Sequence, residues 1–157
     1  MTELDGVYLK EIVEHGLREF PNECCGLIAA QDGVPAKVFT MKNADASPVT
    51  YRLDGVEQLR VFDQMDDEGL ELWAIYHSHT HSEAYPSDTD VKLAFYPDAR
   101  YILVSLADRA DPVTRSFFIV DGEVTEEEVQ VVENYMFSHT GASDVPDQAD
   151  VPDPTRS

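Results

Sequence analysis

The chain has few basic residues. It contains 11 Lys and Arg against 31 Asp and Glu, which gives a formal net charge of −20. A surface this acidic repels the phosphate backbone of nucleic acids and the anionic headgroups of membranes. We therefore expect neither nucleic acid nor a membrane surface among the partners of this protein.

Cysteine is equally scarce. The sequence has two cysteines, Cys24 and Cys25, which are adjacent. Neighbouring cysteines rarely satisfy the geometry of a disulfide, so the sequence predicts no disulfide scaffold. Free thiols suit a reducing compartment, which favours a cytoplasmic location. We expect both thiols to pack in the core as small apolar groups.

Long apolar segments are missing as well. No run reaches the ~18 residues that a membrane-spanning helix needs. The first 17 residues, MTELDGVYLKEIVEHGL, mix acids and bases and contain no apolar core of a signal peptide. The sequence therefore predicts neither a membrane span nor a secretory signal.

The remaining composition is that of one folded domain. A chain of 157 residues with 43% hydrophobic residues can fill a single core. Residues 138–157 differ, because they hold three prolines and four aspartates and almost nothing to bury. We expect a folded domain over residues 1–137 and a disordered acidic, proline-containing tail over 138–157.

Predicted helices and strands alternate along this domain. Apolar periodicity predicts a helix over residues 5–20, ended by Pro21, and another that starts at Asp54 or Gly55. Strands are expected at 24–30, 36–41, 70–76, 101–107 and 115–120. A short helix is expected at 90–96 and irregular chain at 77–89. Residues 124–132 are expected to form either a strand or a helix. This alternation predicts an α/β fold with a mixed β-sheet flanked by helices.

Three histidines alternate after the strand predicted at 70–76. Side chains two positions apart on an extended chain point the same way, so His77 with His79, or His79 with His81, could face one ion. All three could not, because the outer two would lie about 13 Å apart. Asp90, at the start of the next helix, could add a carboxylate. Two histidines and one aspartate leave a fourth position open, which is the pattern of a catalytic zinc site.

Two more residues could support such a site. Ser87 precedes Asp90 by three positions, a spacing that also fits a simple helix cap, and a cap would still fix where Asp90 points. Glu23 lies just before a buried strand and is a candidate general base, although on its own a Glu after Pro-Asn is more simply read as a solvated loop residue. A rival zinc site of the deaminase kind, built on the cysteines, lacks the His-x-Glu and Pro-Cys-x-x-Cys motifs.

Together these residues resemble the signature of the JAMM (MPN+) metalloprotease family. The spacing His-x-His-x7-Ser-x2-Asp runs without a gap from His77 to Asp90, and Glu23 lies upstream. The resemblance covers residues 5–132 and implies a cytidine-deaminase-like three-layer sandwich. It implies one Zn²⁺ per chain held by His77, His79 and Asp90. It also implies that Glu23 acts as the base and that Ser87 hydrogen-bonds the oxyanion, and it gives His81 no role.

Further stretches are similar to a bacterial subgroup of this family. They are residues 21–26, 47–48, 51–52, 76–80 and 83–87. Members of this subgroup act on a cysteine adduct of a ubiquitin-like sulfur carrier that ends in Gly-Gly. The resemblance thus implies a peptidase of cysteine biosynthesis that hydrolyses the amide after Gly-Gly and releases cysteine. Thr80 stands where deubiquitinating members usually carry proline.

Two alternatives stay open on this evidence. One is a JAMM isopeptidase that removes a ubiquitin-like modifier from lysines, and the other is a non-catalytic MPN scaffold. In the peptidase reading, the loops at 43–53 and 80–86 would wall a groove for the glycine tail. Tyr51, Arg52 and Tyr85 are candidate substrate contacts, with ordinary loop packing as the simpler reading.

Overall fold

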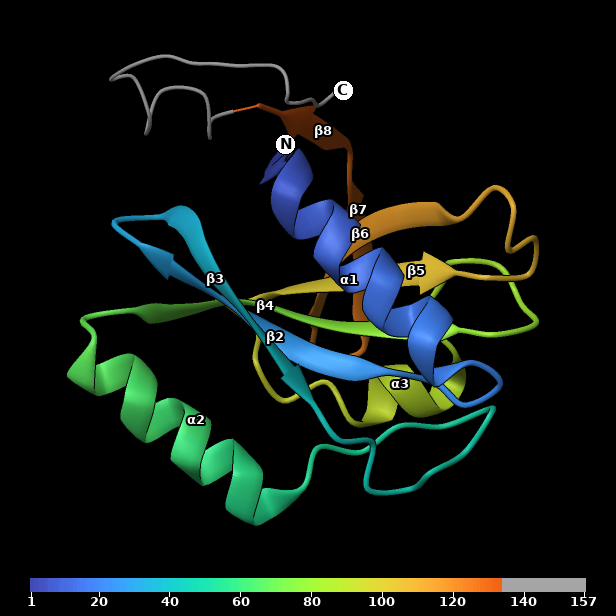
Figure 1. The fold of residues 1–157 in the computed structure, drawn as a ribbon, viewed down its shortest axis with the longest axis horizontal. Coiled ribbons are helices and arrows are strands. Elements are labelled where there is room, and N and C mark those ends of the chain that lie inside the picture. The colour runs from blue at the N-terminus through green and yellow to red at the C-terminus, as the bar shows by residue number, and fades with distance from the viewer. Residues whose placement is uncertain (134–157) are drawn as a thin grey trace.

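A computed structural model describes residues 1–133, so the tail predicted at 138–157 lies outside the described residues (Figure 1). A six-stranded sheet with the order β3-β2-β4-β5-β6-β7 forms its centre. Its strands are β2 (Cys25–Gln31), β3 (Val34–Met41), β4 (Glu71–His79), β5 (Arg100–Ser105), β6 (Val113–Val120) and β7 (Glu123–Glu127). Strands β4 and β5 are parallel and all other neighbours are antiparallel, so the mixed sheet is confirmed.

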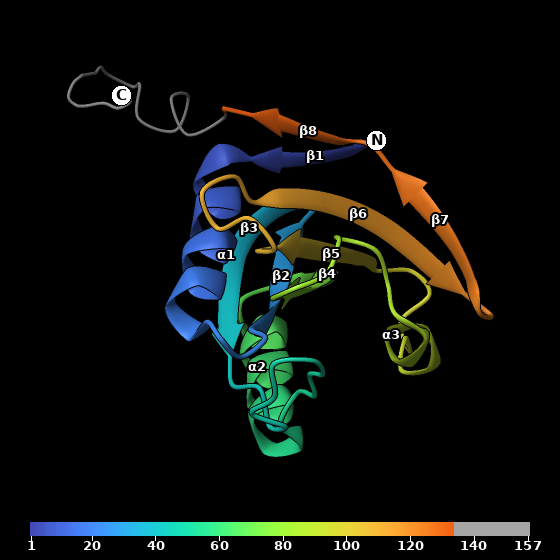
Figure 2. The ribbon, with the colours of Figure 1, turned by 90° about the vertical axis from the view of Figure 1, so that its right-hand side faces the viewer.

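Helices cover both faces of this sheet. They are α1 (Gly6–Glu19), α2 (Gly55–Asp67) and α3 (Asp88–Lys92). Residues of α1 pack with Ala74 and Tyr76 of β4, whereas residues of α2 and α3 pack with Ile75 of the same strand. Because successive side chains of a strand point to opposite faces, the two sets form separate cores. Figure 2 shows α1 and α3 on opposite sides of the sheet, which confirms the three-layer α/β arrangement.

Local sequence signals explain several of these elements. Asp5 and Asp54 cap α1 and α2, and their side chains accept hydrogen bonds from backbone N–H groups inside the first turn. The turns Asp32-Gly33 and Asp121-Gly122 each place both residues at positive φ, between 51° and 81°. That geometry suits the tight turn of a two-residue hairpin, so these turns join β2 to β3 and β6 to β7.

Two predicted boundaries were wrong. Strand β4 continues through His79, because residues 77–79 pair with residues 103–105 of β5 and are not irregular. Helix α3 spans Asp88–Lys92 and not 90–96, because Ser87 caps it early. Of the two alternatives expected for 124–132, the hairpin strand is confirmed, since β7 pairs with β6, and β8 (Val129–Val132) pairs elsewhere.

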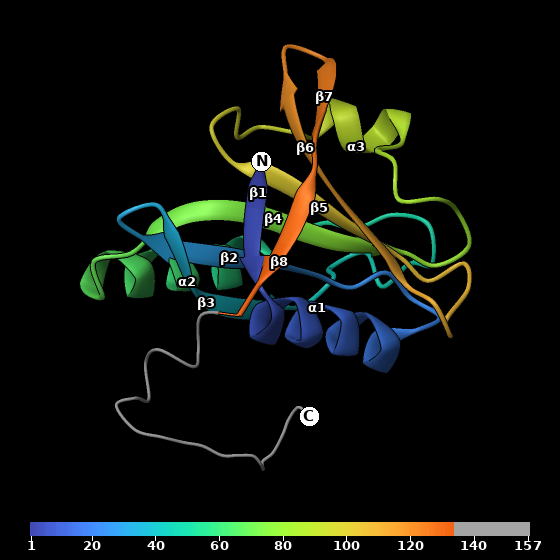
Figure 3. The same cartoon turned by 90° about the horizontal axis from the view of Figure 1, so that it is seen from above.

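Strand β1 (Thr2–Asp5) was not predicted at all. It pairs in parallel with β8, so the two ends of the described chain meet in a second, two-stranded sheet. Figure 3 shows β1 and β8 side by side. A strand of four residues has little pattern of its own, and here its partner lies more than a hundred residues away in sequence.

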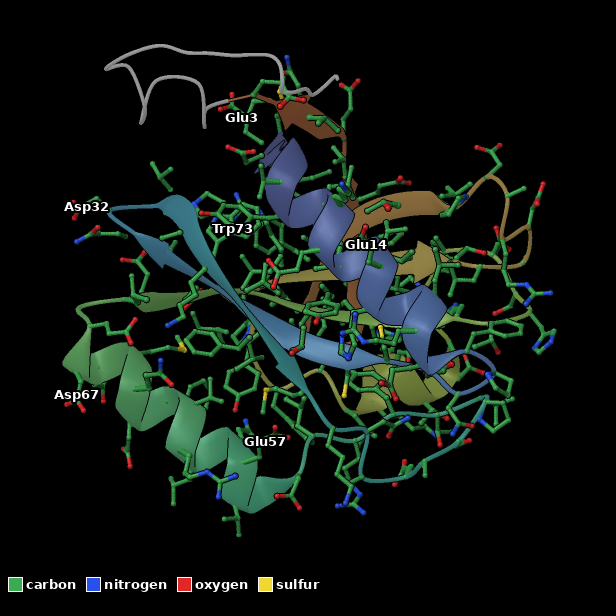
Figure 4. All side chains as sticks on the ribbon, in the orientation of Figure 1. Glu3, Glu14, Asp32, Glu57, Asp67 and Trp73 are labelled. Atoms are coloured by element: carbon green, nitrogen blue, oxygen red, sulfur yellow. The ribbon has the colours of Figure 1, made fainter. Side chains whose placement is uncertain are left out.

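The acidic residues are spread over the surface. Glu3, Asp32 and Asp67 are all exposed and lie at the periphery of Figure 4 on separate parts of the fold, whereas Trp73 is buried. The charge is therefore not confined to one patch. Within residues 1–133, no helix is long and apolar enough to cross a membrane.

Replacing Gly26 should destabilise the fold. A Cβ at this position would meet the carbonyl oxygen of Phe39 and would lie 2.5 Å from the hydroxyl oxygen of Tyr76. Overpacking of this kind costs about 1–3 kcal/mol, so Gly26→Ala should lower the free energy of unfolding by that amount in urea titrations. Gly55→Ala is the control, because a Cβ there meets nothing within 4 Å. Equal unfolding midpoints for the two variants would contradict this packing argument.

Candidate metal centre

The end of β4 carries the two histidines. His77 and His79 are two residues apart on one strand and so point to the face that α3 covers. Ser78, between them, points to the opposite face, where its Oγ accepts a hydrogen bond of 2.8 Å from the Cys24 N–H. Pairing with β5 holds this end of β4 extended, which gives both imidazoles a fixed direction.

The first turn of α3 supplies the carboxylate. Ser87 Oγ accepts a hydrogen bond of 3.1 Å from the Asp90 N–H, and the Ser87 N–H donates one of 2.9 Å to Asp90 Oδ2. This is a capping box, so the structural reading of the Ser-x-x-Asp spacing is confirmed. The same cap holds the Asp90 carboxylate in place beside the two histidines.

The three side chains meet at one point. Asp90 Oδ2 lies 3.1 Å from His77 Nε2 and 3.0 Å from His79 Nε2, and the candidate ligand atoms all lie within 4.8 Å of one another. All three residues are buried. Two imidazole nitrogens and a carboxylate oxygen form a donor set that suits Zn²⁺ and leaves a position open.

A neighbouring hydrogen bond orients one of the rings. His79 Nδ1 lies 2.7 Å from the carbonyl oxygen of Glu83. A carbonyl only accepts, so Nδ1 carries a proton, and Nε2 is the nitrogen left to face Asp90 and to ligate a metal ion. Metal-ligating histidines are commonly fixed in this way. The residues present therefore fit a zinc ion.

The pKa shifts in this cluster favour the ionised form of the Asp90 carboxylate. Burial by itself would raise the pKa of Asp90, but the hydrogen bonds from His77 and His79 outweigh it and hold that pKa well below its usual range. Burial lowers the pKa of His77. Burial also opposes the charged form of His79, yet its bonds to Asp90 and Glu83 leave the pKa of His79 raised.

Glu23 lies beside this cluster. It lines a cavity of about 170 Å³ together with His79 and Ser87. Its carboxylate is buried, and Oε1 has no hydrogen-bond partner among the described residues. Burial is the main cause that raises the pKa of Glu23 to about 8, and the charge of Asp90 adds to it while His79 opposes it. A buried acid facing a cavity and poised near neutral pH has the properties of a general base.

The candidate substrate contacts have different surroundings. The ring of Tyr51 stacks on His77 with centroids 4.1 Å apart, a contact that no local sequence pattern predicts. Arg52 forms an exposed ion pair of 3.1 Å with Asp45. Tyr85 packs edge-on against Phe117. These contacts agree with the simpler reading of loop packing.

His81 and the two cysteines lie outside the cluster of His77, His79 and Asp90. His81 is an exposed loop residue whose Nδ1 lies 2.9 Å from Thr80 Oγ1, so it is not part of the three-residue cluster. Cys24 and Cys25 are free and buried, as expected. Burial raises the pKa of the Cys24 thiol to about 11, which leaves it unreactive at neutral pH.

Comparison with known proteins gives consistent relatives. The family described as prokaryotic homologues of the JAB domain matches residues 7–120. A protein of Mycobacterium tuberculosis named CysO-cysteine peptidase is 52% identical over 126 residues, which cover 79% of this chain and 86% of that protein. A Thermus thermophilus protein named probable TtuB-protein conjugate cleaving protease is 36% identical over 116 residues, or 73% and 74% of the two chains.

A solved structure agrees with these relatives. The solution structure of a Desulfitobacterium hafniense protein superposes on this structure with a TM-score of 0.77 at 35% sequence identity. The superposition covers 85% of this chain and 94% of that one. The resemblance to the JAMM group is thus confirmed at the level of the domain family. The chain belongs to the family of prokaryotic JAB-domain proteins.

Proposed function

We propose that this protein is a zinc-dependent peptidase that hydrolyses the amide after the C-terminal Gly-Gly of a ubiquitin-like sulfur carrier and releases cysteine. The observation that carries the proposal is the convergence of His77, His79 and Asp90 beside the buried Glu23. The 52% identity to a CysO-cysteine peptidase supports the choice of substrate.

His77, His79 and Asp90 would hold the ion. When bound, Zn²⁺ supplies Lewis acidity toward the scissile carbonyl and makes water a nucleophile near neutral pH. Glu23 accepts the proton of the attacking water and then delivers it to the departing amino group of cysteine. The burial of Glu23 suits both steps, because it raises the pKa of Glu23 and so makes its carboxylate a stronger proton acceptor.

Ser87 would stabilise the developing negative charge. Its Oγ accepts the Asp90 N–H in the helix cap, which leaves the hydroxyl proton available for donation. A hydroxyl donor placed near a tetrahedral oxyanion acts only as charge develops, which is where catalysis benefits most. The cap and the catalytic role are therefore compatible in one side chain.

We further propose a cytoplasmic location and a role in cysteine biosynthesis. The two free thiols support a reducing compartment. The relative named as a TtuB-protein conjugate cleaving protease favours a second candidate function, an isopeptidase that removes a ubiquitin-like modifier from other proteins. A non-catalytic scaffold is disfavoured because all three candidate ligands are present and converge.

Purified protein should contain close to one zinc per chain, measured by inductively coupled plasma mass spectrometry. His77→Ala should lose both the metal and hydrolysis, because it removes one of the three ligands. Removal of the ion with a chelator should abolish hydrolysis, and added Zn²⁺ should restore it. A metal-free wild-type protein that hydrolyses its substrate would contradict the proposed chemistry.

Glu23→Gln should separate catalysis from metal binding. The amide keeps the size of the side chain but cannot take up the proton, so kcat should fall about 10²–10⁴-fold while the zinc content stays unchanged. Glu14→Gln is the matched control, since Glu14 is exposed on α1. A Glu23→Gln variant with wild-type kcat would remove Glu23 from the mechanism.

The two candidate activities can be separated with defined substrates. One incubation would use a carrier ending in Gly-Gly-Cys, and the other would use the same carrier joined to a lysine side chain of a protein. We expect mass spectrometry to detect release of cysteine and of the Gly-Gly-ended carrier. Cleavage of the lysine conjugate alone would reject the cysteine-adduct assignment in favour of the isopeptidase.

A further inference from the structure

We propose that the cavity beside Glu23 is the pocket for the leaving amino acid, and that Thr80 limits it to a single small residue. This inference rests on the proposed function and adds a specificity determinant to it. The cavity has a volume of about 170 Å³ and is lined by Glu23, His79 and Ser87 on the side of the site. Its other walls are Pro48, Val49, Thr80, His81 and Ser82.

The position of Glu23 assigns this cavity to the leaving group. In the proposed reaction Glu23 protonates the departing amine, so the residue that carries this amine must lie next to the Glu23 carboxylate. Glu23 Oε1 is buried and has no partner within residues 1–133, and the cavity is the space that this side chain lines. Pockets for drug-sized ligands are about 300–1,000 Å³, so this smaller cavity suits one amino acid.

The first wall of the cavity is held by a hydrogen-bonded loop. The Glu23 N–H donates to the Ser47 carbonyl at 2.9 Å, and Ser47 Oγ accepts the N–H groups of Val49 and Thr50. Asn43 Nδ2 donates to the carbonyls of Glu23 and Thr50 at 3.1 and 2.9 Å. These bonds tie the loop to the backbone of the proposed base, so the wall keeps its place relative to Glu23.

The second wall is anchored to β5 and the residue that follows it. Ser105 Oγ donates to the Ser82 carbonyl at 2.6 Å, and the Leu106 N–H donates to the His79 carbonyl at 2.8 Å. The segment after β4 is thereby fixed at both ends of its first turn. Both walls are formed before any substrate binds.

Thr80 joins the two walls. Its side chain is buried, and its hydroxyl donates a hydrogen bond of 2.8 Å to the carbonyl oxygen of Pro48. Because the hydroxyl proton goes to Pro48, the same oxygen accepts from His81 Nδ1 at 2.9 Å. One side chain thus sets the spacing between the loop at 43–53 and the segment after β4. Proline, which has no hydroxyl, could not make either bond.

The hydrogen bond from Thr80 to Pro48 predicts which leaving groups the enzyme accepts. With the walls tied together, a single small residue fits the cavity of about 170 Å³, whereas a bulky residue or a dipeptide needs more room than the walls leave. Without the Thr80 hydroxyl the walls can separate, and larger leaving groups gain access. Thr80 is therefore a specificity-determining residue and takes no part in the bond-breaking step.

The test is a leaving-group series with the zinc-loaded full chain. The same carrier would end in Gly-Gly-Cys, Gly-Gly-Ala, Gly-Gly-Trp or Gly-Gly-Cys-Ala, and kcat/KM would be measured for each by mass spectrometry. The wild type should prefer the first two over the last two by at least about tenfold, as expected for a pocket that fits by shape.

Three variants then isolate the hydroxyl of Thr80. Thr80→Val keeps the shape of the side chain and loses the hydrogen bond to Pro48 that joins the walls. It should therefore reduce this preference by about two- to tenfold, the equivalent of one hydrogen bond. Thr80→Ser restores a hydroxyl and should keep the wild-type preference. Thr125→Val makes the same change at an exposed position of β7 and should change nothing.

The outcomes separate this assignment from the proposed function. A wild type that cleaves all four substrates equally refutes the pocket, and so does a Thr80→Val variant that keeps its zinc and loses activity equally toward all four. No cleavage of any Gly-Gly adduct by zinc-loaded wild type refutes the proposed function and, with it, the pocket.

Discussion

The buried carboxylate of Asp90 is the constraint on which the site depends. An anion out of contact with water is costly unless it is hydrogen-bonded. Asp90 Oδ2 lies within hydrogen-bond distance of His77 Nε2, His79 Nε2 and the Ser87 N–H. The two histidines come from the end of β4 and Ser87 caps α3, so the carboxylate can be buried only if the end of β4 and the start of α3 meet correctly. Asp90, one of the three candidate metal ligands, is thus also part of the capping box that begins α3.

The sheet makes this meeting possible. Strands β4 and β5 are the one parallel pair in the six-stranded sheet, and both end at the same edge. Side chains there face α3 on one side of the sheet and the end of α1 on the other. Glu23 precedes β2, which pairs with β4, and so reaches the same edge. The proposed base and the candidate ligands are near each other because β2 and β4 are neighbouring strands.

Much of this arrangement could be predicted from local pattern. Strand alternation indicated that two of the three imidazoles share one direction. The choice of His77 with His79 came from the resemblance to the JAMM spacing. Ser87 was open to two readings, as cap and as catalytic residue, and its geometry accommodates both. The stacking of Tyr51 on His77 could not be predicted, because it joins a loop to a strand 26 positions further along the chain.

What could be predicted depends on how far apart in sequence the interacting residues lie. Turns, helix caps and strand alternation depend on neighbours within a few residues, so the sequence by itself determined the hairpins, the starts of α1 and α2 and the candidate ligands. The tertiary structure alone decided that β1 pairs with β8, that β4 continues through His79, and that the Thr80 hydroxyl donates to the Pro48 carbonyl. Each of these depends on a partner far away in the chain, and only the folded sheet brings such partners within hydrogen-bond distance.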